Sequence, residues 1–385
     1  MKILLISEFF PTGKDFKFSG GVEARTLYLA KYLAKKGHNI TVLTSQLENA
    51  PGKEKLLGFT VLRVGKNRDY KATAGDLIKR ANFAKEAIKM GKSIDCDIID
   101  GSNFLTHFIA RQIASRKKIP VVAWYPDVWI GSWIKNAGIV GILGEFLERF
   151  NLITGFSAYI AISKSTAAKL AKKVRTKITI IPCGIDEDEF GGKHQKSNIS
   201  TIICVSRLAK YKNIKDLILA FALVSKEIGK IKLIIVGSGP QEKNLKSLTK
   251  NLKLESQVQF LSNLPRKELI NLYFSSSIFC LPSSVEGFGI STVESAAAGT
   301  PYVISDIGVF KEVTKNGQGG LLFKLGDIKD LAANLERLLI DRNLYKKKQT
   351  EGQKLAAGYR WPDIALKTEK LYLELIRNHQ SNSLR

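Results

Sequence analysis

Short runs of consecutive apolar residues alternate along the whole chain with longer segments in which apolar residues recur at helical spacing. Continuous apolar runs are typical of parallel strands buried on both faces, and the segments between them are typical of the helices that cover those faces. The strands expected in the first half are Ile3–Ser7, Ile40–Thr44, Thr60–Val64, Asp97–Asp100, Pro120–Tyr125, Tyr159–Ser163 and Ile178–Ile181. Those expected in the second half are Thr201–Ser206, Lys232–Gly237, Val258–Leu261, Phe279–Pro282, Tyr302–Ser305 and Leu321–Phe323. The pattern predicts an α/β protein with two doubly wound sheets.

The apolar runs stop between Pro182 and Ser200, where the chain becomes acidic and rich in glycine, and then polar. Domain boundaries fall in segments of this composition. We therefore expect one domain over residues 1–185 and a second over residues 186–362.

The composition agrees with two globular domains. The chain has 385 residues, 44% of them hydrophobic and 25% charged, which excludes a disordered chain and a peptide-sized binding module. The four cysteines are scattered and form no CxxC pair, so we expect small core residues in a reducing compartment. With only four histidines as well, a Cys/His metal cluster is not expected.

The N-terminal apolar run, Ile3–Ile6, is too short for the hydrophobic region of a signal peptide. No apolar stretch has the length that is needed to span a bilayer. The sequence therefore predicts a cytoplasmic protein, either free or attached from its surface to the inner membrane face.

Charge is the unusual feature of the composition. The chain has 60 Lys and Arg against 35 Asp and Glu, for a net charge of +25, and most of the excess lies in the N-terminal half. Such a field attracts nucleic acid, anionic lipid headgroups and nucleotide ligands alike, so it does not select among them.

The segment Ser206–Lys212 lies between a predicted strand and a predicted helix. Arg207 and Lys212 would leave the carboxyl edge of the sheet together, where ligands of open α/β sheets bind, and two cations there suit a diphosphate. The alternative is a solvated basic turn.

The segment Glu286–Glu294 has the same position after a later strand. Its glycines let the backbone approach a ligand closely, and the helix that follows offers free N–H donors to a phosphate. Glu294, just inside that helix, can accept hydrogen bonds from a diol such as ribose. Glu286, in the loop, is placed to meet a sugar.

Together these segments resemble the nucleotide-sugar-binding half of the retaining family 4 glycosyltransferases, which have the GT-B fold. The matching segments of the second half are Val205–Leu208 with Lys212, Ile235–Pro240, Glu286–Gly289 with Glu294, Gly299–Pro301 and Gly320–Phe323. Those of the first half are Ser19–Glu23, Gly37–Ile40 and Ile181–Asp186 with Phe190. The resemblance implies two Rossmann-like domains that face each other across a cleft, with a last helix at about 363–380 returning to the N-terminal, acceptor-binding domain.

The resemblance also implies roles for individual residues. Arg207 and Lys212 would hold the donor diphosphate and stabilise the charge that grows on the leaving group, while Glu286 would bind the donor sugar. Further donor contacts would come from Gly20, Gly21, Gly237, Gly239, Phe288, Gly289, Ile290 and Glu294, and the nucleotide base would lie near Asn263 and Leu264. The family's retaining reaction is explained by front-face attack, so no protein nucleophile is implied.

The chain departs from the family pattern after the strand Pro120–Tyr125. Many members have a histidine there that contacts the donor sugar, whereas this chain has Pro126 followed by Asp127. Asp127 is a catalytic candidate that replaces the histidine or binds an acceptor hydroxyl; the alternative is a cap on the turn that Pro126 opens. The adjoining Trp124–Trp133 holds three of the four tryptophans, which suits sugar stacking, a lipid boundary or packing under a loop.

An apolar stripe at helical spacing runs through Ile139, Ile142, Leu143, Phe146, Phe150 and Ile153. Such a helix lies on a membrane or packs against the sheet, and we expect packing because its polar face is not basic. Contact with anionic lipid is assigned instead to the basic clusters within Arg111–Lys118 and Lys169–Lys177.

The sequence thus predicts a retaining hexosyltransferase of polysaccharide or glycolipid biosynthesis. It would move a hexosyl group from a UDP- or GDP-sugar to a hydroxyl of a glycan or lipid-linked acceptor, with no metal ion and no cofactor beyond the nucleotide-sugar co-substrate. The alternatives are a nucleotide-sugar epimerase of the same fold and, more remotely, a non-catalytic basic protein that binds nucleic acid.

Overall fold

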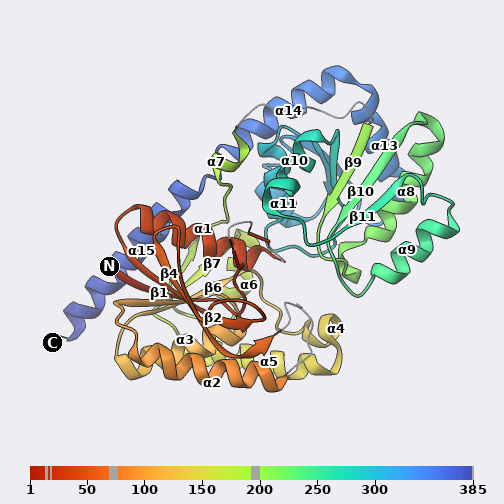
Figure 1. Ribbon diagram of the computed structural model, residues 1–385. Helices are drawn as coiled ribbons and strands as arrows, with labels where there is room; N and C mark the ends of the chain where they lie inside the picture. Colours follow the sequence, from red (N-terminus) through yellow and green to blue (C-terminus); the bar gives the residue numbers. More distant parts are fainter. Residues whose placement is uncertain (14–15, 18–19, 69–76, 192–199, 384–385) are drawn as a thin grey trace. The chain divides into compact units, whose positions relative to one another are not determined.

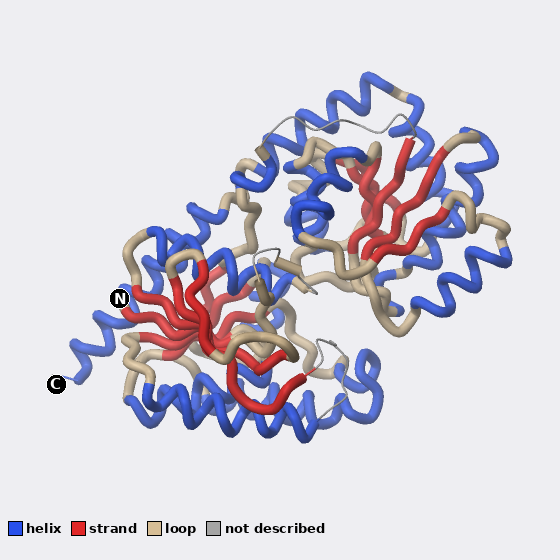
Figure 2. The backbone as a smooth tube through the Cα atoms, viewed as in Figure 1, coloured by secondary structure: helices blue, strands red, loops and turns tan. Residues whose placement is uncertain are grey.

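The computed structural model describes residues 1–13, 16–17, 20–68, 77–191 and 200–383, and the chain divides into two compact units. The first unit contains Met1–Thr12, Gly20–Cys183 and Trp361–Arg385, and the second contains Gly13–Ser19 and Gly184–Arg360. Each unit is built around one sheet with helices on both faces (Figures 1 and 2). Residues 192–199, which belong to the linker expected from the sequence, lie outside the described residues.

The first unit has an eight-stranded sheet in the order β3-β4-β2-β1-β5-β6-β7-β8. Its strands are β1 (Lys2–Ile6), β2 (Asn39–Leu47), β3 (Lys53–Leu56), β4 (Phe59–Arg68), β5 (Ile98–Gly101), β6 (Val121–Tyr125), β7 (Ala158–Ala161) and β8 (Ile178–Ile180). All neighbouring strands are parallel except β3, which pairs antiparallel with β4 at the edge of the sheet. The doubly wound arrangement predicted from the apolar runs is confirmed, and β3 is an addition to it.

Helices cover both faces of this sheet. They are α1 (Gly21–Lys35), α2 (Leu77–Ser93), α3 (Phe104–Lys117), α4 (Trp133–Ala137), the 3₁₀ turn η1 (Gly138–Val140), α5 (Gly141–Thr154), α6 (Lys164–Ala171) and α15 (Trp361–Ser383). α2, α3 and α5 form one layer in which α3 contacts both of the others, and α1 and α15 contact each other on the opposite face (Figure 1).

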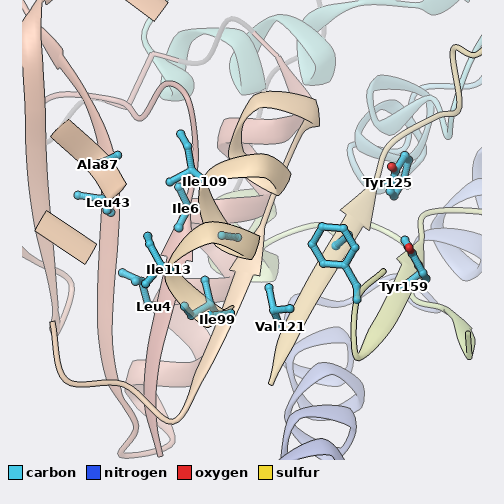
Figure 3. Packing of buried hydrophobic residues seen from close by; sticks show 14 of the residues in the cluster. Leu4, Ile6, Leu43, Ala87, Ile99, Ile109, Ile113, Val121, Tyr125 and Tyr159 are labelled. Carbon is cyan, nitrogen blue, oxygen red and sulfur yellow. The ribbon is translucent and has the colours of Figure 1, made fainter. Parts of the chain in front are cut away.

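The core of the first unit explains why its strands are continuously apolar. Ile3–Ile6 of β1 is almost completely buried because β1 lies inside the sheet, between β2 and β5. Leu4 and Ile6 pack with Ile109 and Ile113 of α3 in the cluster shown in Figure 3. Neighbouring residues along a strand point to opposite faces, so both faces of the sheet need apolar side chains.

A buried ion pair holds α15 on this unit. The guanidinium of Arg25 on α1 donates to both carboxylate oxygens of Asp100 on β5, at 2.9 and 2.7 Å, and the hydroxyl of Tyr372 on α15 donates to the same carboxylate. Burial alone would lower the pKa of Arg25, but the Asp100 carboxylate raises it above its usual value. Burial, and then the charge of Asp100, raises the pKa of Tyr372, so the phenol keeps its proton.

The second unit has a six-stranded, fully parallel sheet in the order β11-β10-β9-β12-β13-β14. Its strands are β9 (Ser200–Val205), β10 (Ile231–Val236), β11 (Val258–Leu261), β12 (Ile278–Leu281), β13 (Tyr302–Ser305) and β14 (Gly320–Phe323). Its helices are α7 (Glu187–Phe190), η2 (Lys210–Lys212), α8 (Ile214–Ile228), α9 (Glu242–Asn251), α10 (Arg266–Ser275), α11 (Ile290–Ala297), α12 (Gly308–Val313), α13 (Ile328–Ile340) and α14 (Arg342–Ala356). Every strand predicted for this half is found.

The cysteines are core residues, as predicted. Cys96, Cys183, Cys204 and Cys280 are all free thiols and all buried. Burial raises the pKa of Cys96 to about 11 and that of Cys204 to about 12, so these thiols stay protonated.

Within the described residues, no helix combines the length and the hydropathy that a bilayer crossing requires.

The buried pair predicts a large difference between two substitutions that both affect contacts of α15. Asp100→Asn leaves the Arg25 charge buried without its counter-ion and should lower the free energy of unfolding by about 3–5 kcal/mol. Glu374→Gln removes a pair with Lys177 whose side chains are about half exposed, and should cost less than about 1 kcal/mol. Urea unfolding followed by circular dichroism measures both, and equal losses would contradict the assignment of Asp100 as the anchor.

Candidate functional site

The predicted site residues of the second unit lie on loops that leave one edge of its sheet. Because the sheet is parallel, the loops after β9, β10, β11 and β12 all emerge at the carboxyl ends of their strands. The chain runs from β9 outwards to β10 and β11, and then returns to place β12 on the other side of β9. The order therefore reverses between β9 and β12, and such a reversal is where open α/β sheets bind ligands.

An ion pair spans this reversal point. Lys212, in η2 after β9, contacts the Oε1 atom of Glu286, in the loop after β12. Both side chains are only 11% exposed. The hydroxyl of Ser283 donates to the same carboxylate oxygen at 3.0 Å, so the position of Glu286 is set from two directions. The structure thus brings together two residues that the sequence predicted for one site.

Further hydrogen bonds join the same two loops. The side-chain amide of Asn213 donates to the carbonyl of Pro282 at 3.1 Å. The backbone N–H of Ser284 donates to the carbonyl of Tyr211 at 2.9 Å. Asn213 has a left-handed backbone (φ 50°), which asparagine tolerates better than most residues. These contacts hold the Lys212 loop and the Glu286 loop as one structure.

Arg207 is exposed on the loop after β9, and the loop after β10 supports the backbone around it. The N–H of Leu208 donates to the carbonyl of Ser238 at 2.9 Å. A Cβ atom at Gly237 would lie 1.9 Å from the carbonyl oxygen of Ser206, and one at Gly239 would lie 2.5 Å from that of Leu208. The close approach of the two loops therefore requires both glycines, whether or not they also contact a donor.

The glycine-rich loop after β12 leads directly into α11. Gly289 is the N-cap residue and has a left-handed backbone (φ 82°), and a Cβ atom there would lie 2.6 Å from the ring of Phe310. Glycine offers no side-chain cap, and the first N–H groups of a helix have no partner within the helix. With Phe288 buried beneath the loop and Ile290 beginning the helix, this turn presents backbone donors of the kind that bind phosphate.

Glu294 is buried on α11 and is held by α10. Its Oε1 atom pairs with the guanidinium of Arg266 at 2.7 Å, and its Oε2 atom accepts from the hydroxyl of Tyr273 at 3.0 Å. Burial, and then the Glu294 carboxylate, raises the pKa of Tyr273, so the phenol remains a donor. A carboxylate has about four acceptor positions, so Glu294 can still accept from a diol.

Arg266 and Tyr273 were not among the residues predicted from the sequence. They lie on α10, whereas Glu294 lies on α11, and no local spacing relates them. Arg266 also donates through Nε to Glu189 at 2.9 Å. Ser283 was missed as well, although its position three residues before Glu286, at a strand end, is a local signal.

The residues assigned to the nucleotide base follow β11. Asn263 is exposed with a left-handed backbone (φ 54°), and Leu264 is half-buried. The N–H of Gly237 donates to the carbonyl of Leu261 at 2.8 Å, which fixes the end of β11 beside the glycine loop after β10. Among the residues that the structure describes, no three or more His, Cys, Asp or Glu side chains are grouped so as to hold a metal ion.

In the first unit, the predicted glycines lie at the start of α1. The N–H of Gly20 donates to the Glu23 carboxylate at 3.0 Å and closes the first turn of the helix. A Cβ atom at Gly20 or Gly21 would meet no atom within 4 Å, so packing does not require glycine at either position. Ser19, which precedes them in the motif, lies outside the described residues.

Asp127 is buried just after β6, and it has partners within its own unit. Its Oδ1 atom accepts from the N–H of Val128 at 2.8 Å and from the Lys169 ammonium at 2.6 Å. The carboxylate therefore supports the turn after Pro126, as the alternative interpretation expected. Contact between Asp127 and a substrate stays a prediction.

The aromatic segment after β6 is fixed by a buried carboxyl on α5. The indole N–H of Trp133 donates to Glu148 at 2.6 Å, and the backbone N–H of Trp129 donates to it at 3.2 Å. The ring of Trp133 also packs edge-on against Phe104, with 4.6 Å between ring centroids. Burial raises the pKa of Glu148 to about 7, although both hydrogen bonds act in the opposite direction.

The expected packing of α5 through its apolar stripe is wrong. Ile139, Ile142, Leu143, Phe146, Phe150 and Ile153 are all exposed, whereas Glu148 and Asn151 are buried. The side-chain amide of Asn151 donates to the carbonyl of Phe104 at 2.7 Å. The side of α5 that faces the protein thus carries these hydrogen bonds together with Leu152, which packs in the core cluster.

Family models match both halves of the chain. The model described as Glycosyltransferase Family 4 matches residues 19–189, and the model described as Glycosyl transferases group 1 matches residues 186–355. An uncharacterised glycosyltransferase of Methanocaldococcus jannaschii is 25% identical over 97% of this chain and 98% of its own.

Solved structures share the fold of the chain. Sucrose-phosphate synthase from Thermosynechococcus elongatus superposes with a TM-score of 0.84 at 20% identity, over 98% of this chain and 99% of its own. The Anabaena protein HepE in complex with UDP-glucose gives 0.75 at 19% identity, over 97% and 100%. The predicted GT-B fold is confirmed.

The carboxyl of Glu148 predicts a pH dependence of stability. Its pKa in the folded protein, about 7, lies above the ordinary value of 4.5, so between these values the folded state binds a proton that the unfolded state releases. This contribution is present below about pH 4.5 and is lost as the pH rises to 7, at a total of about 3 kcal/mol.

Glu148→Gln removes the titration. The difference in unfolding free energy between the variant and the wild type should therefore move in favour of the variant by that amount between pH 4.5 and pH 8. Denaturant unfolding at a series of pH values measures this difference. Glu145→Gln, on the same helix, is the reference for removing a carboxylate, and a difference that stays constant for Glu148→Gln would contradict the buried carboxyl.

Proposed function

Because the chain belongs to the family 4 glycosyltransferases, with a group 1 glycosyl transferase match over its second half, we propose that it transfers a hexosyl group from a UDP- or GDP-sugar to a hydroxyl. The acceptor would be a glycan or a lipid-linked molecule, and the product would keep the anomeric configuration of the donor. The contact between Lys212 and Glu286 at the reversal point of the second sheet carries this proposal.

The proposed donor site uses the two loops that the ion pair joins. The ammonium of Lys212 and the guanidinium of Arg207 would bind the diphosphate, together with the N–H groups at the start of α11. These charges are present before the reaction, so they stabilise the negative charge that develops on the leaving group without reorganisation. Glu286, beside Lys212, would accept hydrogen bonds from the sugar.

The nucleoside would extend from the diphosphate towards α11 and β11. Glu294 would accept hydrogen bonds from the ribose, in the orientation that Arg266 and Tyr273 impose. The base would lie near Asn263 and Leu264. The UDP-glucose complex of HepE, a protein with the same fold, supports a UDP-sugar as the first donor to test.

The proposed transfer needs no protein nucleophile. The bond between the anomeric carbon and the phosphate oxygen breaks, and the acceptor oxygen bonds to that carbon on the same face. The acceptor proton passes to the departing phosphate oxygen. Two cationic side chains would supply the electrophilic assistance, so we propose a reaction without a metal ion and without a cofactor beyond the nucleotide sugar.

A thermal-shift panel of UDP-, GDP- and ADP-sugars tests the donor site, because a ligand that binds only the folded state raises the melting temperature. One UDP- or GDP-sugar should stabilise the wild type, and Lys212→Met should abolish that shift and reduce transfer by about a hundredfold or more. Lys210→Met, in the same 3₁₀ turn but exposed, is the matched control and should retain both.

Two outcomes would contradict the proposal. One is a panel in which no UDP- or GDP-sugar stabilises the protein. The other is a Lys212→Met variant with wild-type transfer. Product analysis by NMR reports the configuration of the new bond, and inversion would contradict the retaining mechanism.

Arg266 is proposed as a positioning residue for the nucleoside, because it contacts Glu294 rather than any group of the proposed donor. Arg266→Met keeps an unbranched side chain but leaves Glu294 without its cation, and should weaken the binding of free UDP or GDP by about tenfold. The KM for the donor should rise with little change in kcat. Lys267→Met, exposed at the next position, is the control, and a fall in kcat with unchanged KM would contradict the positioning role.

A further inference from the structure

Large apolar side chains are exposed on three consecutive elements, α4, η1 and α5, and we call this group the α4–α5 face. Its members are Ile134, Ile139, Ile142, Leu143, Phe146, Phe150 and Ile153. Ile139 and Ile153 are 82% and 84% exposed, close to the exposure of an isolated side chain. Scattered exposed apolar residues are ordinary, but a group of this size marks an interaction surface.

The orientation of α5 is set by polar contacts on its other side. Glu148 accepts from the indole N–H of Trp133, and Asn151 donates to the carbonyl of Phe104. Arg111 of α3 donates to the carbonyl of Thr154 at the end of the helix, at 3.3 Å. Rotating the apolar side of α5 inwards would break these bonds and expose the buried carboxyl, so the α4–α5 face is a built feature of the fold.

Positive charge lies beside this face in the same helical layer. α3 contacts α5, and α2 contacts α3 (Figure 1). α2 carries five lysine or arginine residues and one glutamate, and α3 carries three basic residues and no acidic one. The apolar helix and its basic neighbours together have the two properties of a surface that lies in the headgroup region of an anionic bilayer.

We propose that the α4–α5 face inserts into the surface of a bilayer containing anionic phospholipid, with α2 and α3 against the headgroups. Isoleucine, leucine and phenylalanine side chains enter the acyl boundary without leaving polar groups unsatisfied. The basic residues of α2 and α3 repel a second copy of the chain at the same face, whereas they attract anionic lipid. Among the partners that would cover an apolar face, an anionic lipid surface matches the positive charge around it.

The inference deepens the proposed function and rests on it, because attachment to a membrane would bring the protein to a lipid-linked acceptor. The test of the inference does not require that acceptor. The acceptor-binding unit would be held at the surface where such an acceptor is anchored. Recruitment to vesicles needs neither donor nor acceptor, so it is measured separately from transfer.

Vesicle flotation tests the proposal with the full chain. Vesicles of phosphatidylcholine with phosphatidylglycerol should carry the wild type to the top of the gradient at low salt, and vesicles of phosphatidylcholine alone should carry much less. The variant Ile142→Ser, Phe146→Ser, Ile153→Ser should lower the bound fraction at least tenfold. Its matched control, Leu223→Ser, Leu325→Ser, Ile340→Ser, replaces three exposed apolar residues of the second unit and should bind as the wild type does.

A charge variant measures how much the basic residues of α2 contribute to membrane binding. Lys85→Gln, Lys89→Gln, Lys92→Gln removes three exposed charges of α2 and should weaken binding to anionic vesicles and reduce its dependence on salt. Thermal unfolding checks that the serine and glutamine variants are folded. The α5 serine variant should melt no lower than the wild type, because none of its substituted side chains is buried.

Three results would overturn the proposal. In the first, the wild type fails to float with anionic vesicles at low salt. In the second, the α5 serine variant floats as well as the wild type. In the third, sedimentation without vesicles shows a dimer that the same variant abolishes, which assigns the face to a second copy. The donor thermal shift and transfer to a water-soluble acceptor, both measured without vesicles, report on the proposed function independently of these results.

Discussion

The pairing of Lys212 with Glu286 depends on the strand order of the second sheet. The two residues are far apart in the sequence, and they meet because β12 returns to the free side of β9. Opposite charges at this point hold two loops together, and they place a cation and an anion beside each other. In the proposed site, Lys212 would meet the negative diphosphate of a nucleotide sugar, and Glu286 would meet its hydroxyl-rich ring.

Most of the fold follows from the apolar runs, because strands buried on both faces leave a signal that does not depend on distant contacts. β3 was missed because it leaves no such signal. Its sequence, Lys53–Leu56, has three consecutive charged residues at an edge of the sheet, where pairing with one neighbour suffices and no continuous apolar run is needed. The loops that follow the strands of the second unit were also predictable, since parallel strands bring their carboxyl ends to one edge whatever the rest of the fold.

The predictions failed where partners come from another element. Nothing near Arg266 in the sequence indicates Glu294, because their contact depends on how α10 packs beside α11. The apolar stripe of α5 was correctly recognised, but its direction was predicted from hydrophobic burial alone. The hydrogen bonds of Glu148 and Asn151 and the burial of Leu152 lie on the other side of the helix, and a helical pattern does not reveal which of its faces has such partners.

The C-terminal helix affects the order in which the chain acquires its structure. α15 belongs to the first unit, and its Tyr372 occupies the buried position beside Asp100 and Arg25. During synthesis from the N-terminus, the strands of the first unit leave the ribosome early, whereas the helix that completes it emerges only after the entire second unit. The nascent first unit must therefore exist for a time with the α15 side of α1 uncovered, and its Asp100–Arg25 pair is sealed from water only after α15 has been synthesised.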